Sequence, residues 1–503
     1  MKVIEGARVL APGLVNGERL DIVIEGDRIA DLVPPGTVTS LDAERLDARG
    51  RLAMPGLVNA HTHGHGGLSK AVGDRWNLEL LLNAAPWIGG QRTHEDKHLS
   101  ALINAAEMAL KGCTACYDLC FEFPAPSVEG LAAVAQAYAD VGIRAVIAPM
   151  VADLTFYQSV PGLMKSLPHT LRGRVEAMHM GPADSTLAAI DTAARAWRYP
   201  SDRVRLAVAP TIPLHCSEAF LTGCRDLARE HGLAMQMHLG EAKYQAVSGI
   251  RRYGKSLTAA LDAAGLLGPS FSAAHAVWLD DGDIARLADR GAQVAHNPGA
   301  NLRLGSGIAP VRAMLERGVP VGVGTDGSAS SDNQNMFEAM RLAAYVSRAV
   351  DQPVTDWVGA ADALRMATEG SARVLGFDTL IGRLTRGYKA DVVLLDLGHI
   401  NMIPLNDPIN QIVNAEDGGA VHTVMVGGRV IVENRRLVAL DMARLAAQAE
   451  AAVERLGRVN APARSFAERL APLVSGFCRG LADEPYPSSH PIHRHVPADR
   501  HRH

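Results

Sequence analysis

An apolar run passes directly into a pair of histidines in the stretch Pro55-Gly56-Leu57-Val58-Asn59-Ala60-His61-Thr62-His63. The residues from Leu52 to Val58 have the composition of a buried strand. Side chains two positions apart on a strand point to the same face, so the imidazoles of His61 and His63 would face the same way. Such a pair at a strand end can hold a metal ion, or it can be two surface histidines at a glycine-rich turn. The rest of the chain must decide between these interpretations.

The composition is that of an ordinary globular protein. The chain has 503 residues, of which 48% are hydrophobic and 21% are charged. This length predicts either one large barrel with an accessory domain or two to three domains. The net charge is −4 and no run of Lys and Arg stands out, so nothing indicates a nucleic-acid or membrane partner. We find no signal-peptide core and no apolar run long enough to span a bilayer, and we therefore expect a cytoplasmic protein.

Residues 55–385 alternate short apolar runs with helical stretches rich in Ala and Leu. A Thr93-x-x-Asp96 capping signal opens one such helix, which extends to Leu110. Repeated strand–helix units over this length predict a parallel sheet, most economically a closed (β/α)₈ barrel. The strand candidates are Cys113–Leu119, Ala145–Met150, Arg174–Met180, Val204–Ala209, Ala234–His238, Phe271–His275, Gln293–His296 and Val319–Gly324.

Both ends of the chain predict β-structure outside the barrel. Residues 1–54 are typical of β-hairpins, and residues 386–440 contain strand candidates at Asp391–Leu395 and Val421–Val432. We expect these two segments to form one small β domain beside the barrel. Residues 441–483 are predicted to be helical, and residues 484–503, rich in Pro, His and Arg, are predicted to be a flexible tail.

Polar residues follow several strand candidates at the point where each strand ends. They are His238, His275, His296 and Asp326. Because the carboxyl ends of barrel strands meet at one mouth, we expect these groups to lie near His61 and His63. Imidazoles with a carboxylate suit one divalent ion, zinc first, with iron, cobalt or nickel also fitting. Glu241, three residues after His238, is the natural proton carrier that does not itself bind the metal.

In these motifs the sequence resembles the amidohydrolase superfamily, and within it the branch of guanine, 8-oxoguanine, isoxanthopterin and adenosine-type deaminases and s-triazine hydrolases. The resemblance extends over roughly residues 1–440. It implies a distorted (β/α)₈ TIM barrel with a β-sandwich built from both chain ends. The segments that carry it are His61-Thr62-His63, His238-Leu239-Gly240-Glu241, His275, His296 to Pro310, and Gly324-Thr325-Asp326-Gly327-Ser328.

The resemblance also implies roles for individual residues. His61, His63, His238 and Asp326 would bind a single metal ion, and Glu241 would transfer protons. His275 would be either a fifth ligand or a hydrogen-bond partner of the metal-bound water, which it would orient with Asp326. The related dinuclear enzymes use a barrel lysine, and no lysine occurs in the strand candidates between Cys113 and Ala209, which favours one metal.

The implied activity is hydrolytic deamination of a purine, pterin, pyrimidine or s-triazine. Metal-bound hydroxide would attack a ring carbon and ammonia would leave. One alternative keeps the scaffold but expels chloride, an alkylamine or a thiolate, or cleaves an open-chain urea or amide. Another is a binding subunit that has lost its activity. The expected partner is a small heterocyclic substrate, and homo-oligomers are common among similar enzymes.

Substrate-binding residues are sought in two loops. Asn297, Asn301 and Arg303 follow a strand end in a glycine-rich loop, where they would either contact substrate or hold the loop by hydrogen bonds. Trp87 and Gln91 lie in segment 68–91, where substrate choice is expected to be set, but they are equally typical of packing.

Three further motifs match known signatures but fit their chemistry poorly. His94-Glu95-Asp96-Lys97-His98 matches the H-E-x-x-H metalloprotease motif, yet it occupies the polar first turn of a helix. The glycine motif Gly322 to Gly327 would place Asp326 against a dinucleotide phosphate. Cys113-x-x-Cys116 lacks a second such pair and is predicted to be buried in a strand.

Overall fold

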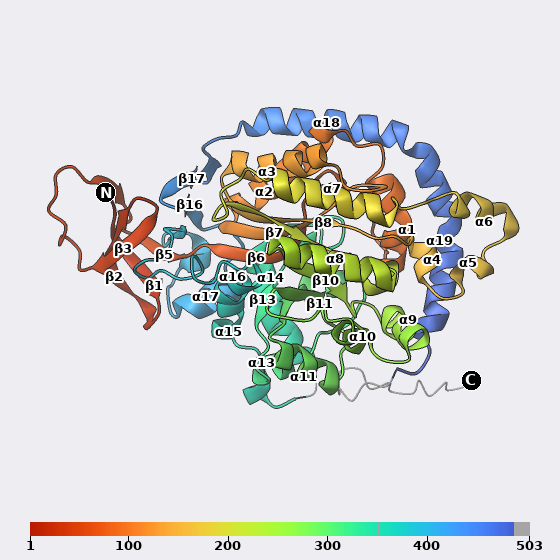
Figure 1. Ribbon diagram of the computed structural model, residues 1–503. Coiled ribbons are helices and arrows are strands. Elements are labelled where there is room, and N and C mark those ends of the chain that lie inside the picture. Colours follow the sequence, from red (N-terminus) through yellow and green to blue (C-terminus); the bar gives the residue numbers. More distant parts are fainter. Residues whose placement is uncertain (351, 487–503) are drawn as a thin grey trace, which may run out of the picture.

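The computed structural model describes residues 1–350 and 352–486 (Figure 1). A parallel sheet forms the larger part, in the order β13-β12-β11-β10-β9-β8-β7-β6-β14. Because β13 pairs with β12 while β14 pairs with β6, the short segment that contains both strands closes the sheet into a ring. The predicted distorted barrel is thereby confirmed. Its strands are β6 (Leu57–His63), β7 (Cys113–Phe121), β8 (Arg144–Met150), β9 (Val204–Val208), β10 (Ala234–Leu239), β11 (Phe271–His275), β12 (Gln293–His296), β13 (Val321–Val323) and β14 (Asp326–Gly327).

Gly324, which lies between β13 and β14, allows the segment that closes the ring to approach β6 closely. A Cβ atom there would come within 2.8 Å of the backbone nitrogen and oxygen of His61. Any side chain would therefore push the closing segment away from β6. The absence of a side chain lets the backbone carry Asp326 directly beside the end of β6.

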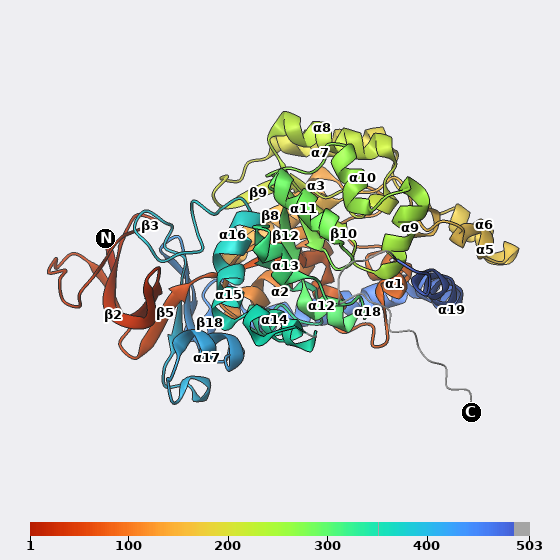
Figure 2. The ribbon, with the colours of Figure 1, turned by 90° about the horizontal axis from the view of Figure 1, so that it is seen from below.

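Helices cover the outside of the ring (Figures 1 and 2). The predicted cap of α2 is present, since Thr93 and Asp96 bond each other's backbone N–H groups. The helices are α1 (Leu78–Ile88), α2 (His94–Leu110), α3 (Val128–Val141), α4 (Phe156–Ser159), α5 (Leu163–Ser166), α6 (His169–Glu176), α7 (Ala183–Ala196), α8 (Glu218–His231), α9 (Lys243–Tyr253), α10 (Leu257–Ala263), α11 (Asp281–Arg290), α12 (Pro298–Arg303), α13 (Val311–Glu316), α14 (Met336–Val346), α15 (Ala360–Arg365), α16 (Ser371–Val374), α17 (Pro408–Asn414), α18 (Met442–Val459) and α19 (Ala461–Ala482).

One strand prediction is wrong. The candidate Arg174–Met180 is not a strand, because α6 extends through His169–Glu176 and a loop follows it. Leu171 and Val175 are both buried, and their separation of one helical turn places them on the same face. A short apolar segment such as residues 174–180 is compatible with the spacing of a helix as well as with a buried strand, so periodicity alone does not distinguish them.

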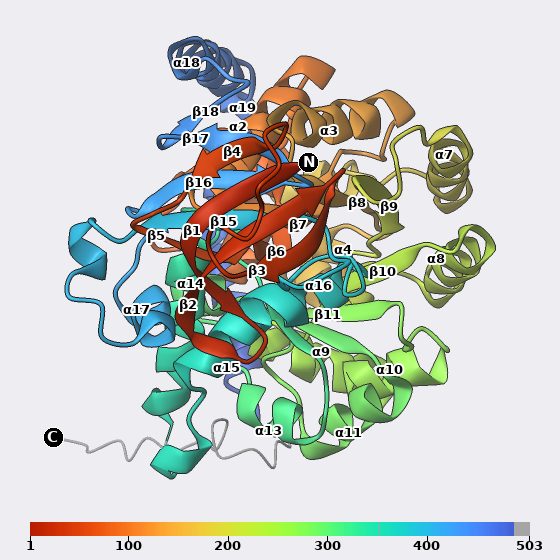
Figure 3. The same cartoon turned by 90° about the vertical axis from the view of Figure 1, so that its left-hand side faces the viewer.

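A second sheet joins the two ends of the chain, as Figure 3 shows face-on. Its order is β18-β17-β16-β15-β5-β1-β2-β3, with β4 on β1, and β15 pairs antiparallel with β5. Arg144 on β8 forms a buried ion pair with Asp391, which precedes β15, and this pair links the sheet to the barrel. The predicted domain boundaries stay predictions. The strands are β1 (Lys2–Ala11), β2 (Leu14–Glu25), β3 (Arg28–Val33), β4 (Glu44–Asp47), β5 (Arg51–Pro55), β15 (Val392–Asp396), β16 (Val421–Val426), β17 (Arg429–Glu433) and β18 (Arg436–Leu437).

The C-terminal helices pack on the barrel helices. Helix α19 lies against α1 and α9, and α18 lies against α2 (Figure 2). Through this packing α19 supports α1. Most of the predicted tail, residues 487–503, lies outside the described residues. Within the described residues no helix is both long and apolar enough to span a membrane.

Candidate metal centre

Four imidazoles and one carboxylate meet at the carboxyl-terminal mouth of the barrel. His61 and His63 end β6, His238 lies near the end of β10, and His275 ends β11. The Oδ1 atom of Asp326 lies 3.3 Å from His61 Nε2 and 3.0 Å from His63 Nε2. The Nε2 atoms of His63 and His238 are 3.2 Å apart. The structure therefore brings together five of the six groups that the sequence predicted to converge, and His296 is the exception.

The other ring nitrogen of each histidine has an oxygen partner. The Nδ1 of His63 lies 2.8 Å from the carbonyl oxygen of Leu119, and that of His238 lies 2.8 Å from the carbonyl oxygen of Thr211. A carbonyl oxygen only accepts, so each Nδ1 carries the proton and donates it. Each Nε2 then presents a lone pair. Two lone pairs 3.2 Å apart repel each other unless a cation lies between them.

Side-chain amides set the remaining two histidines in the same way. His61 Nδ1 lies 2.6 Å from Gln236 Oε1, and His275 Nδ1 lies 2.9 Å from Asn301 Oδ1. The atoms His61 Nε2, His275 Nε2 and Asp326 Oδ1 are buried without a hydrogen-bond partner in the described structure. Oxygen partners behind ligating histidines are the usual outer shell of a metal site. The donor set fits a divalent cation that prefers nitrogen and oxygen ligands.

The protonation states of the cluster also favour metal binding. Burial holds the pKa of His61 and of His238 below the ordinary value, so both rings stay neutral and able to ligate. Burial by itself would lower the pKa of His63, but the neighbouring Asp326 carboxylate raises it. Burial would likewise raise the pKa of Asp326, but the imidazoles of His63 and His61 hold it well below its usual range. Asp326 is therefore a carboxylate, as ligation requires.

Two of the five residues have a backbone conformation that is unusual for residues other than glycine. The φ angle is +70° at His275 and +62° at Asp326. Residues held in the left-handed region cost energy and cluster at functional sites. Ser330 stabilises the second of them, because its hydroxyl donates to Asp326 Oδ2 at 2.8 Å.

Glu241 lies beside the donors. Its Oε2 atom is 3.8 Å from His275 Nε2, and its side chain is almost fully buried. Gly240, with φ of +57°, makes the sharp turn after β10 that brings Glu241 into the cavity. Burial, reinforced by the charge of Asp326, raises the pKa of Glu241 well above its usual value. The carboxyl group can therefore hold a proton close to neutral pH.

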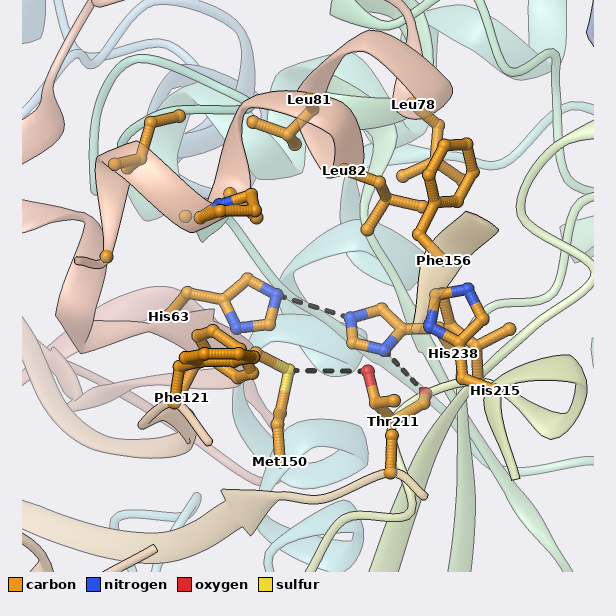
Figure 4. Close-up of a pocket in the computed structure, with 18 of the residues that line it drawn as sticks. His63, Leu78, Leu81, Leu82, Phe121, Met150, Phe156, Thr211, His215 and His238 are labelled. Atoms are coloured by element: carbon orange, nitrogen blue, oxygen red, sulfur yellow. Dashed lines mark hydrogen bonds between the residues drawn. The ribbon is translucent and has the colours of Figure 1, made fainter. Parts of the chain in front are cut away.

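An apolar cavity opens directly onto this cluster (Figure 4). His63, His238, Glu241 and Asp326 form its inner end. Segment 68–91, in which the sequence placed substrate choice, contributes α1 as one wall. The rest of the lining includes the side chains of Leu78, Leu81, Leu82, Phe121, Phe123, Met150, Leu154, Phe156, Tyr157, Met178, Met180, Ile212 and His215, with His65 and Thr155 as further polar members.

The five predicted substrate residues lie outside the cavity wall. Arg303 bonds Asp332 and the carbonyl oxygens of residues 73 and 74, and therefore holds a loop. Asn301 contacts His275, and Asn297 is buried at the start of α12. Trp87 lies under the guanidinium of Arg464 on α19, and Gln91 is exposed. Their contact with substrate stays a prediction that the cavity does not support.

The remaining motifs take structural roles. His98 contacts Asp140 on the outer surface and His94 is near Ser127, so neither is near the donor cluster. No helix begins within Gly322–Gly327, so the geometry of a dinucleotide site is missing there. Cys113 and Cys116 are buried thiols in β7, and burial raises the pKa of both. The prediction that His296 joins the cluster is wrong, because its ring, although buried at the end of β12, is not among the donor atoms that lie close together.

Sequence reasoning missed the partners behind the histidines. Gln236 was detectable, because it lies two residues before His238 on β10 and so shares its face. The carbonyl groups of Leu119 and Thr211 give no sequence signal, since every residue has one. His215, which also lines the cavity, was not predicted either.

Comparison with known proteins agrees with this geometry. The model of the amidohydrolase family matches residues 52–431. A 5'-deoxyadenosine deaminase of Methanosarcina mazei is 33% identical over 464 residues, which cover 91% of this chain and 99% of the relative. A zinc-bound crystal structure of an adenosine deaminase from Xanthomonas campestris is 27% identical with a TM-score of 0.80, over 90% of this chain and 98% of that one.

A second solved structure extends the comparison. Atrazine chlorohydrolase from Arthrobacter aurescens TC1, complexed with zinc, is 27% identical with a TM-score of 0.79, over 90% of this chain and 100% of that one. The zinc-bound neighbours and the converging donors together support a divalent metal site. The family match and the relatives at this identity leave one conclusion, that this chain belongs to the amidohydrolase family and is an enzyme that hydrolyses carbon–nitrogen bonds other than peptide bonds.

Proposed function

We propose that this protein is a zinc-dependent hydrolytic deaminase of a nitrogen heterocycle. The observation that carries the proposal is the set of four histidines whose Nδ1 atoms all face an oxygen acceptor, which turns four Nε2 lone pairs toward Asp326 Oδ1. His61, His63, His238 and Asp326 would hold one ion, with His275 beside it. The deaminase relatives support the reaction type.

The bound cation would supply one thing, a water molecule whose pKa falls from about 16 toward about 7. The residues of the chain do the rest. Asp326 and His275 orient the attacking oxygen toward a ring carbon. Glu241 accepts one proton from it and delivers that proton to a ring nitrogen. The second proton then passes from the new hydroxyl on the ring carbon, through Glu241, to the departing amine. Water is consumed, the ring gains a carbonyl oxygen, and the amine leaves as ammonia.

A second reaction deserves a parallel measurement, because one neighbour is a chlorohydrolase. The same attack on a ring carbon expels chloride if the ring bears chlorine in place of an amine. We would incubate the zinc-reconstituted enzyme with amino- and chloro-substituted purines and s-triazines and measure released ammonia and chloride. The proposal expects ammonia from the amino compounds. Release of chloride alone would favour the second reaction.

Two further properties remain sequence-based predictions. They are a cytoplasmic location and a homo-oligomeric state. Size-exclusion chromatography with light scattering on the purified protein measures the second directly.

A further inference from the structure

The cavity outside the metal centre has an apolar wall that continues along α1. Leu78, Leu81 and Leu82 project from this helix toward the space above His63 and His238 (Figure 4). Phe156 lies beside Leu82 and belongs to the same cluster of apolar side chains (Figure 4). The wall is a fixed part of the fold, because α19 packs behind α1, and Asn83 on α1 donates to the carbonyl oxygen of Ala467 on α19 at 2.9 Å.

Charge is confined to the inner end of the cavity. Among the residues that line it, all within the described part of the chain, the acidic ones are Glu241 and Asp326, and no lysine or arginine is present. Both carboxyl groups belong to the centre described above. The outer cavity therefore offers no ionic partner to a charged substituent, and burying an unpaired charge there would be costly.

Most polar groups in the outer cavity already have partners. The hydroxyl of Tyr157 donates to Asn83 at 2.9 Å, and the carbonyl oxygen of Thr211 accepts from His238. Two histidines are exceptions. His65, whose ring centroid lies 5.2 Å from that of His63 at the inner end, has a buried Nδ1 without a partner in the described structure. In the outer part, the buried ring of His215 lines the cavity and lies tilted at 6.3 Å from the ring of Phe156. Burial and the charge of Arg252 keep that imidazole neutral. A neutral imidazole supplies one donor and one acceptor, which is too few to satisfy both hydroxyls of a ribose.

We propose that the substrate carries an uncharged apolar substituent, alkyl or aryl, which lies between α1 and Phe156. Leu82 and Phe156 are then specificity-determining residues, and ribosides are poor substrates because their hydroxyls would be buried without partners. This inference rests on the proposed function, since the reacting ring must reach the metal centre. By this inference the substrate of this chain differs from those in the names of its relatives, which specify deoxyadenosine or adenosine.

The test compares compounds whose substituents are of similar size, one apolar and the others carrying two hydroxyls. We would measure ammonia release from 9-butyladenine, 9-(2,3-dihydroxypropyl)adenine and 5'-deoxyadenosine, and from melamines with the same butyl and dihydroxypropyl groups. A hydrophobic pocket discriminates against an added hydroxyl by up to about 100-fold. We expect kcat/KM to favour each butyl compound by roughly that factor. A dihydroxypropyl compound or 5'-deoxyadenosine used as well as its butyl counterpart would overturn the inference.

Two variants on one helix localise the effect. Leu82→Gln should reduce the preference for butyl about tenfold, mainly by raising KM for the butyl compound. Leu80→Gln, on the same helix but outside the cavity wall, should leave the preference unchanged. If both variants shift the preference equally, Leu82 is not a specificity residue and the inference fails.

Binding keeps the two proposals distinguishable. Calorimetric titration of the zinc-loaded wild-type protein with the same pairs needs no turnover. Tighter binding of the butyl compounds without any ammonia release would support the apolar subsite and contradict the proposed deamination. Equal or tighter binding of the hydroxylated compounds would contradict the apolar subsite whatever the activity.

Discussion

The side-chain oxygen Oδ1 of Asn301 lies 2.9 Å from Nδ1 of His275 and accepts a hydrogen bond from it. This contact fixes the tautomer in which Nε2 of His275 faces Asp326 and Glu241 with a lone pair. Asn301 is buried and does not line the cavity. We therefore propose that it acts on the reaction through His275, as a positioning residue, while the contact with substrate that its loop position suggested stays a prediction.

The first prediction concerns this contact. Asn301→Ala removes the acceptor, so the imidazole can take either tautomer, and we expect kcat to fall by about 10- to 100-fold with little change in KM. Asn301→Asp keeps an acceptor oxygen and should retain most of the activity. Steady-state kinetics of the three proteins measure this. A parallel rise in KM, or equal losses in both variants, would indicate a structural role instead.

The second prediction concerns Gln236, whose Oε1 accepts from His61 at 2.6 Å. Gln236→Met keeps the volume but removes the acceptor, and the affinity for zinc should fall about 10- to 100-fold. Competition with a chromogenic chelator measures that affinity. Gln293→Met is the matched control, because Gln293 begins β12 at the opposite end of the barrel and bonds the carbonyl oxygen of Pro269. Equal losses in both variants would show that the acceptor behind His61 is irrelevant.

The third prediction concerns Glu241. Glu241→Gln keeps the shape of the side chain but cannot accept or deliver a proton, so kcat should fall by about 10²- to 10⁴-fold while zinc remains bound. Glu107→Gln is the control, since Glu107 pairs with Lys70 and Lys111 on the outer surface. Metal analysis and rate measurement belong together here. Full zinc occupancy with undiminished turnover would remove Glu241 from the mechanism.

How far the sequence could predict this site depends on the kind of group involved. His238, His275 and Asp326 could be placed because each follows an apolar strand, and parallel strands end at one mouth. The carbonyl partners of His63 and His238 could not, because a backbone group has no sequence signature. Trp87 shows a further limit, since its partner Arg464 comes from a C-terminal helix far along the chain. Residues that only tertiary packing brings together cannot be assigned from local pattern.

The fold likewise has parts that local sequence pattern predicts and parts that only packing decides. The alternation of strands and helices predicted the barrel. The hairpin patterns near both ends of the chain predicted the β domain. Residues 174–180 were misassigned because a short apolar segment is compatible with both periods. The segment His169–Glu176 is a helix, in which Leu171 and Val175 are both buried on one face.

The fourth prediction concerns stability against pH at Asp283. Burial raises the pKa of Asp283 to about 6 in the folded protein, from 3.8 ordinarily. The neutral carboxyl is therefore favoured by folding, and its contribution to stability is complete below about pH 4 and is lost as pH rises through 6. In Asp283→Asn the side chain is neutral at every pH, so this loss of folding stability, up to about 3 kcal/mol, does not occur.

Urea denaturation at pH 5 and pH 7 measures the effect. We expect Asp283→Asn to gain stability over the wild type on going from pH 5 to pH 7. Asp289→Asn, exposed on the same helix, should show no such change between the two pH values. A wild type and Asp283→Asn that respond identically to pH would contradict the prediction.

The most direct test of the metal centre is the zinc content of purified, zinc-reconstituted variants. We predict about one zinc ion per chain in the wild type, the single-ion occupancy that four such ligands hold. The variant His61→Ala/His63→Ala should lose that ion. The variant His94→Ala/His98→Ala, altered at the surface motif, should keep it. Zinc retained by the first variant and lost by the second would contradict the account.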